Sequence, residues 1–500
     1  MKKIICCLVI LILFLKVDAQ NQGISNHWLL GYQSIAGPPA GISHFNYYTG
    51  ALNITYDSLP MSFNHTEATI SDTAGNLLFY TNGYYIADAT HDTMMNGSDI
   101  NPGAYRTFCG ANADGGFLIP QAVLILPVSN SNHLYYMFHN TADAYPIIPG
   151  NSTSFKFYLT VIDMNLNSGF GAVTTKNQIL ITDSMNVGKI TACKHGNGRD
   201  WWIFIHRVNS NMFYKFLITP DSIIGPTTQN IGCIRPDDAG QAKFSSDGKR
   251  FTYYVAISGL DIFDFDRCTG DLSNWVHDGN FSLNGGNTGC EFSPNSDVLY
   301  VSNIDTVYQY DLTAANVLTT KSIVAVYDGF NGGALETYLC VPQLAPDGKI
   351  YITTGNGTQY MHVINEPDSL GVACNLVQHG VQLPSYYFNT LPNPPNFFLG
   401  ADTNSVCDSL PHVGITENKQ EPTPKLFPNP TDGKFTLWFA VHDKVGLVQV
   451  YDVNGNLLLQ EPVVQWSQYK HLVIAEQPTG IYFVKMSWGN KTASVKVIKE

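Results

Sequence analysis

Groups that could act as acids, bases or metal ligands do not have the spacing of a known catalytic motif in this chain. Imidazole and carboxylate lie close in sequence at His91-Asp92 and at His65-Thr66-Glu67. Neither pair has the HExxH spacing of a metal-binding helix, and no GxSxG elbow or P-loop is present. The acidic run DIFDFD at 261–266 lacks the Gly and the terminal Glu of a calcium loop. We therefore expect no catalytic residue, metal site or cofactor here, but hydrogen-bonded loop histidines and a strand with solvated carboxylates.

The central region contains a repeated pair of short strands, and these strands must position any site. A unit of two short strands around a tight turn returns six times, for example as AKFSSDGKRFTYYVA from Ala242 and PQLAPDGKIYITTGN from Pro342. The turns are marked by Gly75, Asn132, Gly198, Gly248, Ser296 and Gly348, at intervals of 48 to 66 residues. A period near 50 with four short strands per unit is typical of β-propeller blades.

The chain is therefore predicted to be all-β, with a propeller of seven blades. Six blades are the alternative, and an array of β-sandwiches is a third choice. Segments 28–48 and 381–399 are expected to complete the last blade together, since joining both chain ends protects the edge strands.

Five polar residues are placed by this repeat. Each stands in or just before the first strand of a unit: Glu67, Lys189, Lys243, Glu291 and Gln343. Innermost strands line the central channel of a propeller, and buried polar groups need partners. We expect these side chains to cluster around the axis as a binding mouth of mixed charge. The alternative is that they pair with one another across a water-filled channel and bind no ligand.

Composition limits the partners. The formal net charge is −13, and only 13% of the residues are charged. Nucleic acid is not an expected partner, because its phosphates require a basic surface. No segment after the first 20 residues offers about 18 consecutive apolar residues, so no transmembrane segment is expected.

The N-terminus has the three parts of a secretory signal peptide. Lys2 and Lys3 precede an apolar stretch at 4–15, and Val17-Asp18-Ala19 forms a small-residue cleavage site before Gln20. Cleavage between Ala19 and Gln20 would leave eight cysteines.

These eight cysteines are expected to serve in disulfides rather than in a zinc site. None belongs to a CxxC pair, and an oxidising export route favours disulfides. Closeness in sequence favours the pairs Cys268–Cys290 and Cys374–Cys407, out of about 105 possible connectivities.

The end of the chain is predicted to be a separate small β-sandwich. Residues 426–500 contain, in order, LFPNPTDGKF, VYDVNGNLL, PTGIYFVK and SVKVIKE, in which Asp-Gly and Asn-Gly pairs mark turns between apolar strands. In this order the motifs resemble the type A sorting domain of the type IX secretion system of Bacteroidetes. The resemblance implies recognition by that machinery, passage to the cell surface or beyond, and removal of the domain by a sortase, often with attachment to a surface polysaccharide.

The central region has a resemblance of its own. WLLGY at Trp28, KITACKHGNGRDWWIFIH at Lys189 and GCEFSPNSDVLYVSN at Gly289 resemble a family of secreted Bacteroidetes propellers that commonly carry such a tail. This resemblance implies fold and location, and it supplies no catalytic residues.

A modification pattern is also present. Asp followed by Ser or Thr and then a small or aliphatic residue resembles the O-glycosylation sequon of Bacteroidetes. Its hydroxyls are Ser58, Thr73, Thr93, Ser184, Ser222, Thr306, Ser369 and Ser409. Asp-Ser and Asp-Thr turns explain many such patterns, so we expect modification at only some of them.

The predicted domain order is a signal peptide at 1–19, a propeller at 20–401, a polar, Pro-containing linker at 402–425 and a sorting domain at 426–500. We expect a secreted or surface-displayed propeller that binds a glycan or a protein without catalysis. The alternative is a secreted hydrolase that acts on glycans at the propeller axis, because propellers are also enzyme scaffolds. Two carboxylates about 5 to 10 Å apart in one pocket would favour it.

Overall fold

The computed structural model consists mainly of antiparallel β-sheets. It describes residues 23–48, 52–112, 115–143, 153–236, 240–281, 287–403, 405–408, 424–439, 442, 444–465, 467, 469–489 and 491–500. The expected signal peptide, its cleavage site at Ala19 and Gln20, the glycosylation candidate Ser409 and most of the linker lie outside these residues.

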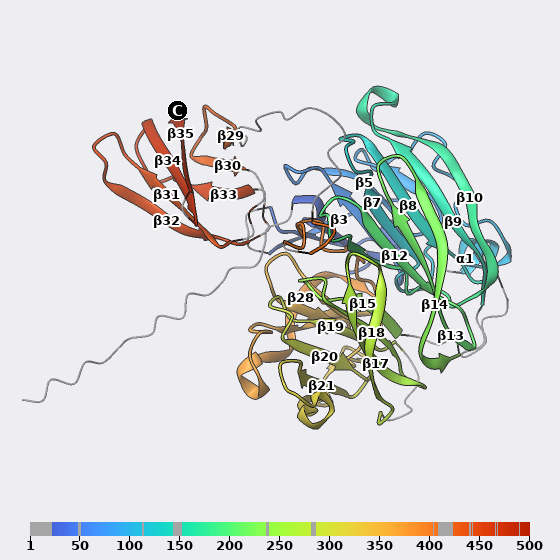
Figure 1. Cartoon of the computed structure of the whole chain (residues 1–500). Helices are drawn as coiled ribbons and strands as arrows, with labels where there is room; N and C mark the ends of the chain where they lie inside the picture. The colour runs from blue at the N-terminus through green and yellow to red at the C-terminus, as the bar shows by residue number, and fades with distance from the viewer. Residues whose placement is uncertain are drawn as a thin grey trace, which may run out of the picture.

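Seven antiparallel sheets of three or four strands follow one another in the described part of the chain before residue 388 (Figure 1). Sheet 1 holds β1 (His27–Tyr32), β2 (Gly41–Asn46) and β3 (Asn53–Asp57), and sheet 2 holds β4 (Ala68–Ser71), β5 (Leu77–Thr81) and β6 (Ile86–Asp88). Sheet 3 holds β7 (Val123–Pro127), β8 (Leu134–Asn140), β9 (Ser154–Asp163) and β10 (Ala172–Met185). Sheet 4 holds β11 (Thr191–Lys194), β12 (Trp201–His206), β13 (Ser210–Ile218) and β14 (Ile223–Arg235).

The remaining three sheets have four strands each. Sheet 5 holds β15 (Gly240–Phe244), β16 (Arg250–Val255), β17 (Gly259–Asp266) and β18 (Asp271–Asp278), and sheet 6 holds β19 (Gly289–Phe292), β20 (Val298–Ser302), β21 (Thr306–Asp311) and β22 (Ser322–Val326). Sheet 7 holds β25 (Pro342–Leu344), β26 (Ile350–Ile352), β27 (Thr358–Ile364) and β28 (Leu376–Tyr387). Outside the sheets lie the hairpin β23 (Asn331–Gly332) and β24 (Leu335–Glu336), helix α1 (Ala104–Asn112), and the 3-10 turns η1 (Gly23–Ser25), η2 (Ser34–Ala36), η3 (Asn167–Gly169), η4 (Val317–Thr320) and η5 (Gly371–Cys374).

The repeat predicted from the sequence is the hairpin of the first two strands of each sheet. All six turn markers lie between these strands. Gly248 and Ser296, for example, adopt φ of 70° and 68°, the left-handed backbone that a tight reversal requires. The marked positions are therefore hairpin formers, as predicted.

The sheets are arranged as a β-propeller. First strands of successive sheets contact one another, as β15 does with β19 and β19 with β25. The ring closes because sheet 7 packs on sheet 1: the Trp28 and Tyr351 rings meet edge to face at 6.1 Å, and the Ser43 and Ser385 hydroxyls are 2.7 Å apart. The propeller fold is thus confirmed, while the sheet count favours seven blades over six and the blade number stays a prediction.

The two chain ends do not share a blade as expected. Among the described strands, β1 and β2 stay in sheet 1 and β28 stays in sheet 7. The structure instead closes the ring by packing between sheets 1 and 7 and by the hydrogen bond that the Tyr386 N–H donates to the Pro39 carbonyl at 2.7 Å. Strand β28 is the edge strand of sheet 7 and pairs with β27 alone among the described strands.

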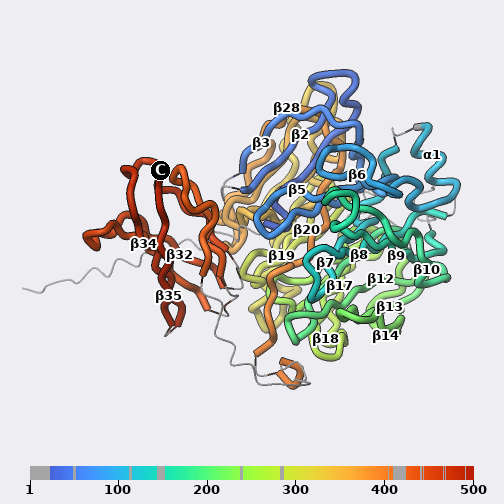
Figure 2. Tube along the Cα trace, turned by 90° about the horizontal axis from the view of Figure 1, so that it is seen from above, coloured from blue at the N-terminus to red at the C-terminus, as the bar shows by residue number. Residues whose placement is uncertain are grey.

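The segment after β28 crosses the centre of the ring (Figure 2). The Asn389 N–H donates to the Asn64 carbonyl at 3.1 Å, near the start of sheet 2. The Asn393 amide donates to the Ile190 carbonyl at 2.6 Å, before sheet 4, and the Asn396 amide to the Ser246 carbonyl at 2.7 Å, after the first strand of sheet 5. The chain itself therefore fills part of the space around the axis.

The disulfide prediction is wrong in both pairs. Cys268 bonds Cys407 across a separation of 139 residues, and Cys290 and Cys374 are free, buried thiols. The ring brings the β17–β18 turn beside the end of the crossing segment, where the Asp402 N–H also donates to the Gly196 carbonyl at 2.7 Å. Nearness in sequence gives no sign of this approach.

The tail, residues 425–500, forms the expected β-sandwich. One sheet holds β29 (Lys425–Phe427), β30 (Lys434–Trp438) and β33 (Tyr469–Val473), and the other holds β31 (Gly446–Tyr451), β32 (Leu457–Val463), β34 (Gly480–Trp488) and β35 (Lys491–Lys499). Alternate residues such as Val448 and Val450 are fully buried between them. No helix in the described residues is long and apolar enough to span a membrane.

Candidate functional site

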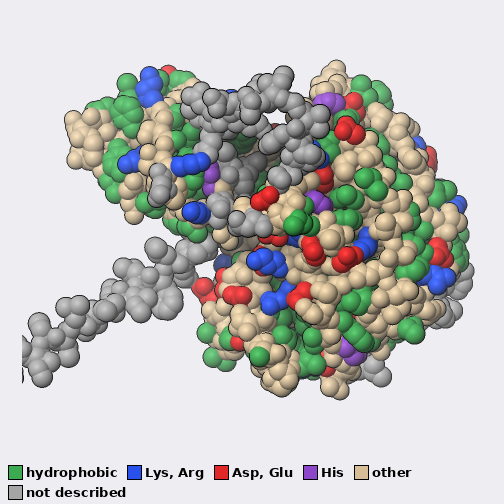
Figure 3. Space-filling model, viewed as in Figure 1, with side chains coloured by type: hydrophobic (Ala, Val, Ile, Leu, Met, Phe, Trp, Pro, Cys, Tyr) green, Lys and Arg blue, Asp and Glu red, His purple; other side chains and the backbone are tan. Residues whose placement is uncertain are grey.

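A cavity of about 380 Å³ lies where the first strands of sheets 4 to 7 end. Hairpin turns of sheets 5, 6 and 7 form part of its wall, and the crossing segment contributes Asn393 and Asn396. Val445, Val464 and Gln465 of the tail also line it. Figure 3 shows acidic and basic side chains gathered near the middle of one face of the molecule, beside the tail. The cavity is a mouth of the propeller that the tail borders.

Three of the five residues selected from the sequence line this cavity. Lys243, Glu291 and Gln343 come from β15, β19 and β25, and each is the last residue but one of its strand. Side chains alternate along a strand, so equivalent positions in neighbouring first strands point the same way. The structure therefore brings these three together.

These three side chains form one buried group. The Lys243 ammonium lies 3.0 Å from Glu291 Oε2 and donates to Gln343 Oε1. The Glu291 carboxylate also accepts the Phe292 N–H at 3.0 Å and the Leu344 N–H at 3.1 Å. The group is thus internally paired, which agrees with the mixed charge expected for a binding mouth and equally with a purely structural pair.

Glu67 and Lys189 lie elsewhere and do not line this cavity. Glu67 is buried beside sheets 1 and 2, where the Thr69 hydroxyl donates to its carboxylate. The Lys189 ammonium donates to the Val187 carbonyl at 2.9 Å. A role for any of the five in ligand binding stays a prediction.

A signal in the sequence separates the two groups. Lys243, Glu291 and Gln343 each stand five residues before a turn marker, and the same count from Gly198 and Gly75 gives Cys193 and Ile70. Glu67 and Lys189 are further from their markers, before the strands begin. The number of residues between a side chain and its turn marker decides whether that side chain enters the mouth. A place in or just before the first strand is not enough.

Lys194 is a cavity residue that the sequence argument missed. Its ammonium lies 4.1 Å from the centre of the Trp201 ring, and burial lowers the pKa of Lys194 to about 7. The ammonium also donates to the Arg199 carbonyl at 3.3 Å. No residue-type motif marks it, because the shift comes from the fold.

Three carboxylates line the cavity: Asp247, Glu291 and Asp368. Asp368 is exposed, and partial desolvation in the cavity wall raises its pKa; its carboxylate accepts the Asn295 N–H at 3.0 Å. Apolar surface comes from Leu399, Pro294 and others. Donors, acceptors and apolar patches of this kind suit a polyol or a polar peptide.

The histidines of the two imidazole–carboxylate motifs, His65 and His91, contact aromatic side chains and do not form a shared site with other reactive groups of the described residues. His65 is buried against the Phe388 ring at 4.9 Å, and burial lowers its pKa to about 3. His91 sits in a turn with φ of 71°, where its Nδ1 lies 3.1 Å from the Tyr80 hydroxyl. Neither histidine lines the cavity.

Glu67 should make stability fall as pH rises. Burial raises the pKa of Glu67 to about 8 from its ordinary value of 4.5, so between these values the folded protein holds a proton that the unfolded chain has lost. Below this window both states are protonated, and above it both are ionised. We expect the free energy of unfolding of Glu67→Gln to lack this dependence on pH. Between about pH 5 and about pH 8, urea unfolding should therefore show wild type losing a few kcal/mol of stability relative to the variant.

The matched control is Glu476→Gln at an exposed position of the tail. Its free energy of unfolding should equal that of wild type at about pH 5 and at about pH 8. Parallel pH profiles for wild type and Glu67→Gln would contradict the assignment of the shift to Glu67.

The glycosylation candidates differ in exposure. Thr306 is buried at the start of β21, where it pairs with β22, and that contradicts its selection as an accessible acceptor in the folded protein. Exposed candidates are Ser58, Thr73, Thr93 and Ser222, and Ser184 and Ser369 are partly exposed. Modification of these six stays a prediction.

The tail has a known counterpart. Residues 425–500 match the model of a secretion system C-terminal sorting domain. The tail is a type IX secretion sorting domain. It directs export to the cell surface or the extracellular space through that secretion system. The match covers the sorting domain alone and assigns nothing to the propeller.

Solved structures resemble the rest of the chain only distantly. A proposed 6-phosphogluconolactonase from Bacteroides fragilis is 14% identical over 73% of this chain and 97% of its own, with a TM-score of 0.40. A periplasmic gluconolactonase from Pseudomonas aeruginosa is 12% identical over 72% and 97%, with a TM-score of 0.38. The Swd1 β-propeller domain from Myceliophthora thermophila is 10% identical over 67% and 91%, with a TM-score of 0.37. No curated protein matches the chain in sequence.

Proposed function

We propose that the propeller is a non-catalytic binding module that the sorting domain delivers to the cell surface or beyond. Its ligand is a glycan or another surface protein, and its binding site is the cavity at the ends of the first strands. The observation that supports this most is the convergence of Lys243, Glu291 and Gln343, from three sheets, on one cavity wall. Export is independent of this proposal, since it rests on the sorting domain.

A glycan array and a polysaccharide pull-down on the purified mature chain test the proposal. We expect wild type to retain at least one polysaccharide or surface protein, and Ser246→Trp, which fills the cavity from the sheet 5 hairpin, to lose at least about 10-fold in affinity. The control Ser322→Trp adds the same ring on the exposed outer strand β22 and should bind as wild type. Equal binding by both variants would exclude the cavity as the site.

A tail-less form should also be tested, because the tail borders the cavity. Such a chain should end after Asp408 rather than at 402, since the Cys268–Cys407 disulfide ties this part of the expected linker to the propeller. We propose that a sortase removes the sorting domain in the linker after export, and N-terminal and C-terminal peptide mapping of the released protein would locate the cut.

The second candidate function is glycan hydrolysis in the same cavity. The observation that favours it is the presence of three carboxylates in the wall, of which Asp368 has a raised pKa. Product analysis of every bound polysaccharide separates the two functions. If wild type forms shortened oligosaccharides and Asp368→Asn does not, the propeller is a hydrolase and not a non-catalytic binding module.

A further inference from the structure

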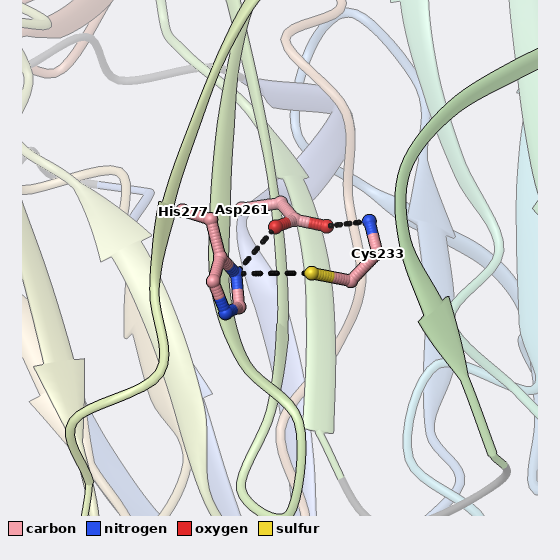
Figure 4. Close-up of side chains that lie close together, drawn as sticks. All are labelled: Cys233, Asp261 and His277. Carbon is pink, nitrogen blue, oxygen red and sulfur yellow. Dashed lines mark hydrogen bonds and ion pairs between the residues drawn. The ribbon is translucent and has the colours of Figure 1, made fainter.

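A second cluster of reactive side chains lies away from the cavity, on the outer strand of sheet 4 and the last two strands of sheet 5 (Figure 4). It consists of Cys233 on β14, Asp261 on β17 and His277 on β18. Each offers one ligand atom, and these three atoms lie within 4.8 Å of one another. In Figure 4 all three side chains point toward one another.

Strand pairing explains why they meet. Asp261 and His277 are direct partners in the β17–β18 register, so their side chains lie on the same face of sheet 5. Strand β14, the outer strand of sheet 4, contacts β18 and brings Cys233 onto that face. The Cys233 N–H then donates to Asp261 Oδ2 at 3.2 Å, which fixes the cysteine beside the carboxylate.

The spacing is close to that of a tetrahedral metal site. His277 Nδ1 lies 2.8 Å from Asp261 Oδ1 and 3.3 Å from Cys233 Sγ. Ligand atoms about 2.0 to 2.3 Å from a tetrahedral Zn²⁺ are about 3.3 to 3.6 Å apart. The His277–Cys233 pair already has this spacing, and the His277–Asp261 pair would have to open by about 0.5 Å to admit the ion.

The same nitrogen faces both other groups, and this argues against a catalytic triad. A nucleophile–histidine–carboxylate triad uses the two ring nitrogens for different partners. Here one ring nitrogen, His277 Nδ1, lies within reach of both Sγ and Oδ1, so the three groups do not form a relay through the ring. Ligand atoms that all lie within 4.8 Å of one another are compatible with a shared metal ion.

The surroundings hold the ligands in place. The Arg235 guanidinium pairs with Asp261 Oδ2 at 2.6 Å, and the Trp275 indole N–H donates to Oδ1 at 2.8 Å. A carboxylate oriented in this way keeps Oδ1 directed at the cluster, and the arginine offsets one of the two negative charges of a thiolate and a carboxylate. His277 is about one-third exposed and Cys233 partly exposed, so solvent reaches the fourth position.

We propose that Cys233, Asp261 and His277 bind one Zn²⁺, with water as the fourth ligand. Thiolate, imidazole and carboxylate are the usual zinc ligands, and a mixed set with an exposed fourth position fits this borderline-soft ion. Cysteine spacing along the chain does not indicate the site, because its ligands come from three strands of two sheets. The prediction that the acidic run is solvated holds for Asp264 and Asp266 and is wrong for Asp261, which is buried.

The test is a zinc titration of the untagged, chelator-treated mature chain. We expect one Zn²⁺ per chain for wild type and a loss of more than about 100-fold in affinity for Cys233→Ser and for His277→Gln, since losing even a supporting residue costs about 10- to 100-fold. Trp275→Phe should lose about 10-fold, because it removes only the hydrogen bond that orients Asp261. The control Cys340→Ser changes a buried free thiol elsewhere and should bind as wild type.

Two readouts keep the result independent of variant folding. Cobalt substitution of wild type should produce thiolate-to-metal charge-transfer absorption, and Zn²⁺ should protect Cys233 from alkylation in the native protein, as read by peptide mass spectrometry. Absence of stoichiometric binding to wild type, or alkylation of Cys233 at the same rate with and without Zn²⁺, would overturn the proposal.

Discussion

Val450→Asp in the sorting domain should retain the protein inside the outer membrane of a host that carries the type IX secretion system. Val450 is fully buried on β31 between the two sheets of the sandwich, and a carboxylate placed there has no partner. Burial of an unpaired charge costs several kcal/mol, enough to unfold a small β-sandwich. Cell fractionation and surface proteolysis should show near-complete loss of the surface and secreted forms, with the propeller still folded in the periplasm.

The control for this prediction is Val453→Asp, three residues later. Val453 is 65% exposed in the turn after β31, so the added charge is solvated and export should proceed as in wild type. A fusion of residues 425–500 to an inert periplasmic protein should reach the surface and lose this ability with Val450→Asp. Surface delivery of the Val450→Asp protein would show that the folded sandwich is not the exported signal.

Local patterns explain how much of this molecule was predictable. Hairpin turns depend on a few adjacent residues, so Gly75, Gly248 and Gly348 marked the repeat and the fold correctly. The motifs of the tail are likewise contiguous, and they located both its fold and its export role. Predictions that rested on contiguous turn and motif residues therefore succeeded, whereas the disulfide pairs chosen by closeness in sequence did not.

Predictions that needed contacts between sheets succeeded only in part. Lys243, Glu291 and Gln343 converge as predicted, whereas the disulfide pairs and the solvation of Asp261 were predicted wrongly. Cys268 reaches Cys407 only because the ring carries the end of the chain past the β17–β18 turn. Asp261 is buried because the outer strand of the preceding sheet covers it, and no feature of the run 261–266 indicates that cover. The lowered pKa of Lys194 has the same origin, since its burial comes from the fold around it. Such properties depend on the angle at which one blade meets the next, which the local sequence does not specify.

Lys243→Met should destabilise the propeller by about 3–5 kcal/mol in urea unfolding. Lys243 and Glu291 are both buried, and removal of the ammonium leaves the carboxylate with two backbone N–H donors but without its counter-charge. The control Lys470→Met breaks the pair with Glu461 on the tail, where both side chains are partly exposed, and should cost at most about 1 kcal/mol. If Lys243→Met and Lys470→Met lose similar amounts of unfolding free energy, burial does not make the Lys243–Glu291 pair more important for stability than the partly exposed pair.

The double variant Lys243→Met, Glu291→Met separates a binding role from a structural one. Replacing both charges of a buried pair by apolar side chains of similar volume is often neutral, so we expect the double variant to recover most of the stability that Lys243→Met loses. It has no charged group left at these two positions of the cavity wall. If the cavity binds its ligand through them, the polysaccharide or protein retained by wild type in the pull-down should be lost by a variant that is nonetheless stably folded. Full retention by the double variant would assign the pair to the support of the ring alone and would leave ligand binding to other residues.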